Sequence, residues 1–114
     1  MLEAEERVTQ EGGVLTHLTY VVSGGMRVEK AGDCFNMPAG LFVGEVAYLM
    51  DQNSAASTWV NAGSEVLQWA VVDLRAKSAR RDRFKLALEA MISKDLAAKV
   101  QLAVAPNTQE WRTQ

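Results

Sequence analysis

Residues Ala39 to Val60 read AGLFVGEVAYLMDQNSAASTWV, and this stretch decides the fold. Gly44 comes before a short helix predicted from Val46 to Met50, and a strand is predicted from Ala55 to Ala62. The small residue Gly44 allows another group to approach the backbone closely at the start of the helix. The stretch therefore predicts a turn, a short helix, a polar loop and a strand, in that order.

Short strands separated by turns surround this stretch. Runs of β-branched and aromatic residues, or alternation of apolar and polar residues, predict strands at Leu18–Val22, Met26–Lys30, Asp33–Met37 and Val66–Val72. Strands this short and this closely spaced indicate a sandwich or a closed barrel. Trp59 and Trp69 lie on predicted strands, and we expect them to pack in the core.

The last third of the chain changes period. From Asp82 to about Val104 the apolar residues follow steps of mostly three and four, which predicts an amphipathic helix. A shorter helix is predicted from Leu74 to Arg80, and Pro106 is expected to end the helical pattern. We therefore predict one mainly β domain of the α+β class over residues 1–106, followed by a flexible tail at 107–114.

Composition excludes several classes of function. The 114 residues are 48% apolar, which is enough for one domain with a core. The net charge of −2 argues against general nucleic-acid binding, which needs a basic face. The single cysteine, Cys34, cannot form an internal disulfide, which fits a reducing compartment. No apolar run is long enough to span a membrane, so we expect no membrane insertion by this segment itself.

The sequence also lacks the usual groups for catalysis. His17 is the only histidine, so a metal-binding jelly roll, which needs a cluster of ligands, is disfavoured. No Cys/His pairing suggests a nucleophile. We therefore predict no catalytic residues, no metal, no cofactor and no enzyme activity.

Two motifs resemble the cyclic-nucleotide-binding domain family, of the type found as the effector domain of catabolite activators. Val8–Val28 resembles the family's opening, with its turn, aromatic strand and Val-x-Val strand. Gly40, Gly44-Glu45-Val46-Ala47, Leu49 and Ser54-Ala55-Ala56-Ser57 resemble its phosphate-binding cassette. The resemblance implies an eight-stranded jelly roll, or double-stranded β-helix, with a short cassette helix and C-terminal helices. It implies cAMP or cGMP as ligand and the candidate binding residues Gly44, Glu45, Val46, Ala47, Ser54 and Ala55.

One position departs from that family's pattern. The family uses an arginine for the cyclic phosphate where this chain has Ser54, which carries no charge. Moreover, no lysine or arginine occurs between Lys30 and Arg75. A cation for a phosphate would have to come from elsewhere, for example from Arg27 or Lys99. Glu45 corresponds to the family's ribose-binding carboxylate, although a carboxylate also suits the start of a helix.

The end of the chain resembles a different branch. Trp69, Leu74 and the segment Ile92–Val100 resemble the end of the Popeye domain, a family that also lacks the cassette arginine and is regarded as binding cAMP. Popeye proteins carry membrane helices, so the resemblance implies a cytoplasmic protein or the cytoplasmic domain of a membrane protein. Members of the cyclic-nucleotide-binding family often pair through the C-terminal helix, and we expect a homodimer of that kind.

Three functions remain open from the sequence. The first is a non-enzymatic regulatory domain with a degenerate cassette. The second is a working cAMP or cGMP sensor that uses Glu45 and backbone amides. The third is a dimerisation or protein-interaction module of a larger protein.

Overall fold

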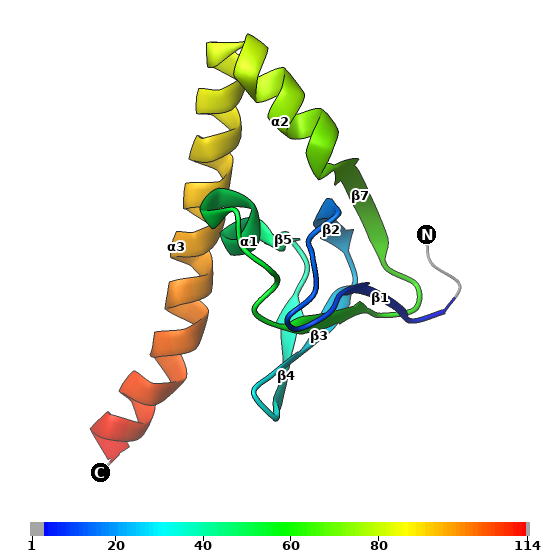
Figure 1. Ribbon diagram of the computed structural model, residues 1–114. Coiled ribbons are helices and arrows are strands. Elements are labelled where there is room, and N and C mark those ends of the chain that lie inside the picture. Colours follow the sequence, from blue (N-terminus) through cyan, green and yellow to red (C-terminus); the bar gives the residue numbers. More distant parts are fainter. Residues whose placement is uncertain (1–3, 114) are drawn as a thin grey trace. The chain divides into compact units, whose positions relative to one another are not determined.

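The computed structural model describes the backbone of residues 4–113 and the side chains of residues 4–100. The chain forms two compact units, Met1–Lys77 and Ser78–Gln114. Figure 1 labels all of its elements except β6. In chain order they are β1 (Glu6–Thr9), β2 (His17–Ser23), β3 (Gly25–Lys30), β4 (Asp33–Pro38), β5 (Leu41–Val43), α1 (Glu45–Met50), β6 (Ser57–Val60), β7 (Glu65–Ala70), α2 (Val71–Arg80) and α3 (Asp82–Thr113). All five strands predicted above are present, and β1 and β5 are additional.

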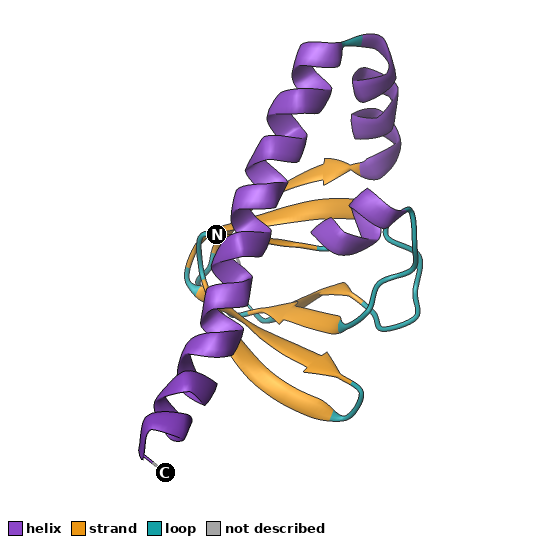
Figure 2. Ribbon diagram, turned by 90° about the vertical axis from the view of Figure 1, so that its left-hand side faces the viewer, coloured by secondary structure: helices purple, strands orange, loops and turns teal. Residues whose placement is uncertain are grey.

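The strands form two antiparallel sheets, whose strands are orange in Figure 2. One sheet has the order β1-β6-β3-β4 and the other has the order β5-β2-β7. Partners lie far apart in the sequence: His17 pairs with Ala70, and Glu6 pairs with Val60. Antiparallel strands that cross between two sheets in this way are typical of a jelly roll.

The predicted strand number was wrong, because residues 4–113 contain seven strands rather than eight and form no closed barrel. Residues 4–16 provide a single strand, β1, and it pairs with β6 in the four-stranded sheet. The second sheet therefore has three strands and ends at β7. The mainly β class with added helices is confirmed.

The core of the first unit uses residues from both sheets. Leu18 and Val21 of β2 and Val60 of β6 have no exposed surface. Ser64, also fully buried, accepts a hydrogen bond at Oγ from Gly25 N at 3.2 Å. This contact is possible because Gly24 has a positive φ of 95° and no side chain, so the backbone of the β2–β3 turn can approach Ser64.

The helices differ from the prediction at their ends. α2 begins at Val71, three residues before the predicted start at Leu74, because β7 ends at Ala70 and Val71 N donates to Thr16 O at 2.9 Å. α3 continues to Thr113, so the predicted helix end at Pro106 was wrong. Proline removes one backbone hydrogen bond from a helix but does not end it when the surrounding bonds form. The flexibility of residues 107–114 stays a prediction.

Trp69 also differs from the prediction. Its side chain is 39% exposed, because β7 lies at the edge of its sheet and has a neighbouring strand on one side only. Within the range that the structure describes, no helix is both long and apolar enough to cross a membrane.

Candidate ligand-binding cassette

Gly44 joins β5 to α1 and sets the geometry of the cassette. Its φ of 92° is in the left-handed region, and its carbonyl accepts the Tyr48 N–H at 2.9 Å, which closes the first turn of the helix. A Cβ added at Gly44 would lie 2.5 Å from Cδ1 of Leu15. The glycine is therefore required by the backbone conformation, and an added methyl group would also displace the end of the Leu15 side chain.

Glu45 follows as the first residue of α1, and only 4% of it is exposed. A carboxylate at the start of a surface helix normally faces water, because burying a charge is costly. The sequence pointed to Glu45, but its burial could not be read from a six-residue helix.

The six predicted site residues occupy one continuous region from the end of β5 to the start of β6. Three of them are buried: Glu45, Ala47 and Ser54. Gly44 is half-buried, Val46 is 45% exposed and Ala55 is exposed. The structure therefore separates the predicted set into residues that face the interior and residues, Val46 and Ala55, that face solvent.

Ser54 is held by a short backbone bridge. Its N–H donates to Gly13 O and its carbonyl accepts from Gly12 N, both at 2.8 Å. Beside it, the Asn53 side-chain amide donates to Gly12 O at 3.1 Å. The position that corresponds to the arginine of the family that the cassette resembles is thus tied to the β1–β2 turn through its main chain. Because its amide already has an acceptor, that amide does not offer a donor to a phosphate.

Arg75 of α2 is the cation that the structure places at the cassette, and nothing in the sequence singled it out. Its Nη2 donates to the Tyr48 carbonyl at 3.0 Å and lies 3.3 Å from Oδ1 of Asp51. The guanidinium also stacks on the Tyr48 ring, 4.6 Å from the centroid. Arg75 therefore satisfies a carbonyl at the C-terminal end of α1, where a cation is favoured.

Replacing Arg75 should loosen this end of the cassette helix. We expect Arg75→Met to lower the free energy of unfolding by about 1–2 kcal/mol, because it removes a charged hydrogen bond and the stacking on Tyr48. Asp51→Asn is the matched control. It removes only an ion pair whose carboxylate is 89% exposed, so stability should change by less than about 0.5 kcal/mol. Urea denaturation measures both, and equal losses would contradict the assignment.

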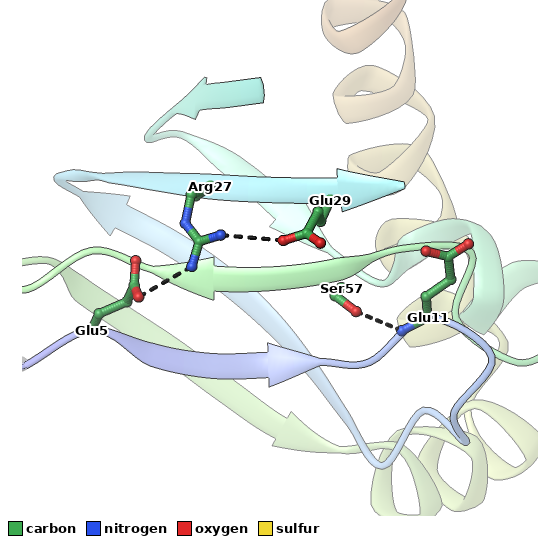
Figure 3. Close-up of polar contacts among 5 residues, drawn as sticks. All are labelled: Glu5, Glu11, Arg27, Glu29 and Ser57. Carbon is green, nitrogen blue, oxygen red and sulfur yellow. Dashed lines mark hydrogen bonds and ion pairs between the residues drawn. The ribbon is translucent and has the colours of Figure 1, made fainter. Parts of the chain in front are cut away.

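Arg27, the first residue named above as a source of positive charge, is used elsewhere. On the four-stranded sheet its guanidinium contacts Glu5 at 3.2 Å and Glu29 at 3.3 Å, as Figure 3 shows, and it stacks 4.1 Å from the centroid of the Trp59 ring. The hydrogen bond from Arg27 to Glu5 raises the pKa of Arg27 further above its ordinary value. Lys99, the second residue named, pairs with Asp95 on its own helix at 3.3 Å.

The β1–β2 turn is also attached to β6 through a side chain. Glu11 N donates to Ser57 Oγ at 2.9 Å (Figure 3). Together with the backbone bonds from Ser54 to Gly12 and Gly13, this bond attaches the β1–β2 turn both to the loop after α1 and to β6. The resemblance of Val8–Val28 to the family's opening predicted a turn in this region, but it did not predict the turn's partners more than forty positions away.

Comparison with solved structures identifies the architecture. A cyclic nucleotide-binding domain from Methylobacillus flagellatus KT matches with a TM-score of 0.77 and 14% identity, covering 94% of this chain and 64% of that chain. The sensor domain of the transcriptional regulator DNR from Pseudomonas aeruginosa matches with a TM-score of 0.63 and 18% identity, over 82% and 70%. This chain has the cyclic nucleotide-binding fold.

A longer protein shares the same fold. The catabolite activator protein of Thermus thermophilus matches with a TM-score of 0.57 and 19% identity, covering 96% of this chain but only 51% of the activator. The sequence itself matches no family model and no curated protein. The resemblance to the cyclic-nucleotide-binding family is thus confirmed at the level of fold, and the resemblance to the Popeye domain stays a prediction.

Proposed function

We propose that this chain is a non-enzymatic regulatory domain on the cyclic nucleotide-binding fold whose cassette does not hold a cyclic phosphate in the usual way. The observation that supports this proposal most directly is the environment of Ser54, namely its burial, its lack of charge and its backbone hydrogen bonds. It is 6% exposed, it has no charge, and its backbone is bonded to Gly12 and Gly13. A cyclic phosphate bound there would lose one charge-assisted contact, which corresponds to roughly tenfold to a hundredfold in affinity.

The charges around the cassette support the same proposal. Arg75 is directed to the Tyr48 carbonyl at the C-terminal end of α1, whereas an anion is favoured at the N-terminal end. Arg27 is engaged by two carboxylates and by Trp59. These two cations are therefore committed to contacts other than a phosphate.

A second function is favoured by one specific observation. Glu45 is almost fully buried at the first position of α1, and Ala47 beside it is 6% exposed. A buried carboxylate next to small residues suits a ligand hydroxyl such as that of a ribose. A cAMP or cGMP sensor that relies on Glu45 is therefore the alternative, and the ligand-binding roles of Gly44, Val46, Ala47 and Ala55 belong to it.

Titration calorimetry with cAMP and cGMP separates the two functions. For the degenerate domain we expect no binding heat at millimolar nucleotide. Micromolar binding that disappears in Glu45→Gln would overturn the proposal and establish the sensor. Glu65→Gln is the matched control, because Glu65 is an exposed glutamate on β7, and its loss should not change nucleotide affinity in either case.

Three further properties remain part of this proposal. They are a cytoplasmic location, with the cytoplasmic domain of a membrane protein as the alternative, a role within a larger protein, and pairing with a second copy through the C-terminal helix. The last is also the basis of the interaction-module function. Sedimentation of the chain with and without residues 82–114 tests that pairing.

A further inference from the structure

The edges of the two sheets are not equally protected. The sheets of the first unit have four edge strands, β1, β4, β5 and β7. Exposed strand edges invite pairing with other chains, and proteins protect them with charges, proline or short length. β1 carries the exposed Glu6 and Arg7, β4 begins at Asp33 and ends at Pro38, and β5 has only three residues. β7 is the exception.

β7 has six residues, EVLQWA, with a single charge at its first position. Its large apolar side chains are exposed, Leu67 by 52% and Trp69 by 39%. It contains no lysine, arginine or proline. It is therefore a long, apolar and unprotected edge.

The direction of the backbone groups on β7 follows from one hydrogen bond. Val71 N donates to Thr16 O, so residue 71 bonds inward to the chain segment that continues β2. Along an antiparallel ladder the bonding direction alternates between successive residues. Trp69 and Leu67 therefore bond to β2, and the N–H and C=O groups of Val66, Gln68 and Ala70 point outward from the sheet edge.

These outward groups match a second copy of themselves. We propose that β7 pairs antiparallel with β7 of another copy of this chain, with Gln68 opposite Gln68, which joins two three-stranded sheets into one. In this register Val66 lies opposite Ala70, so all three outward-pointing residues exchange N–H···O bonds. Leu67 lies opposite Trp69, which places apolar side chains together on one face.

Other registers are less favourable. If one strand slides along the other by a single residue, each outward-pointing residue lies opposite an inward-pointing residue, so the hydrogen bonds could not form. A shift by two, with Leu67 opposite Leu67, places the charged Glu65 opposite Trp69 and leaves Ala70 beyond the partner's strand. The register centred on Gln68 keeps Glu65 opposite Val71, so no like charges meet. Among the registers that place outward groups opposite each other, the one centred on Gln68 pairs all three outward-pointing residues with one another, and with Leu67 opposite Leu67 or Trp69 opposite Trp69 only two of them pair. This self-complementarity is why we infer a second copy as the partner.

Cross-linking tests the register. In a Cys34→Ser background, which removes the exposed native cysteine, Gln68→Cys should form a disulfide-linked dimer under mild oxidation. Residues in a hydrogen-bonded pair lie about 5.5 Å apart at Cα, within the range of a disulfide. Glu65→Cys is the matched control: the two copies of residue 65 would be about six positions, or about 20 Å, apart and should not cross-link.

Sedimentation tests the surface without new cysteines. The wild-type chain should associate through β7, and Leu67→Lys should raise the dissociation constant of this contact at least about tenfold, because a lysine protects the edge. This contact is separate from pairing through the C-terminal helix, which Leu67→Lys would leave unchanged. Val22→Lys is the control, since Val22 is 44% exposed on the central strand β2 and should leave the dimer unchanged. Circular dichroism should show the same folded spectrum for both variants. A monomeric wild type, a Leu67→Lys dimer of unchanged affinity, or equal cross-linking at positions 65 and 68 would overturn the proposal.

Discussion

Gly24→Ala should destabilise this protein more than the same change at any other glycine. A Cβ at residue 24 would lie 2.8 Å from Cα of Ser64 and would also overlap Ser64 Oγ. Ser64 is fully buried, so its main chain cannot move away without disturbing the core. The left-handed backbone adds roughly 1–2 kcal/mol and overpacking adds about 1–3 kcal/mol, so we expect a loss of about 2–5 kcal/mol in the free energy of unfolding.

Gly32→Ala is the matched control for this prediction. Gly32 has a similar φ of 87°, but nothing lies within 4 Å of its added Cβ. It should therefore cost only the backbone term, about 1–2 kcal/mol. Urea denaturation of both variants measures the difference. Equal losses would show that Ser64 yields to the added methyl group and that the close approach is not what requires glycine.

Ser54→Arg is the second substitution with a large expected effect, in this case on binding. If the rest of the cassette is competent, the new guanidinium should strengthen cAMP binding roughly tenfold to a hundredfold over the wild type, because a charge-assisted contact is added. The bridge to Gly12 and Gly13 uses only backbone atoms, so the substitution leaves those bonds possible. Chemical-shift titration by NMR measures even millimolar affinities.

Two controls make this result interpretable. Ser54→Gln adds length and polarity without charge and should not give the gain. Adenosine, which has no phosphate, should bind the Ser54→Arg variant and the wild type equally. A folded Ser54→Arg variant without any gain for cAMP would mean that the cassette is closed to the nucleotide for a reason beyond its missing arginine.

The sequence was most informative where a pattern is local. Alternation and turn residues located β2, β3 and β4 to within about two residues, and the period of the last third located α3. Gly44 was identified before its φ was known, because it belongs to the cassette motif and because a small residue allows a close approach to the backbone.

The sequence was least informative where two distant segments meet. Nothing local to Arg75 shows that it reaches the Tyr48 carbonyl, 27 positions away. Ser54 was recognised as a missing charge, but its bridge to Gly12 and Gly13 depends on how the β1–β2 turn folds back. The strand number failed for the same reason. An eight-stranded roll was inferred from resemblance, and the pairing that leaves β7 at an edge depends on the whole topology.

The pairing of distant strands has a consequence for the order in which the first unit is made. β2 is complete long before its partner β7, because Leu18 pairs with Trp69. Contacts between distant positions form slowly, since a long loop must close first. During synthesis from the N-terminus, β1 must wait for β6. β2 can pair with β5 first, but its other edge must wait for β7 until the chain has passed residue 70. A nascent chain that stalls before that point has incomplete sheets with unpaired strand edges. In this interval the chain is most prone to aggregate with other chains.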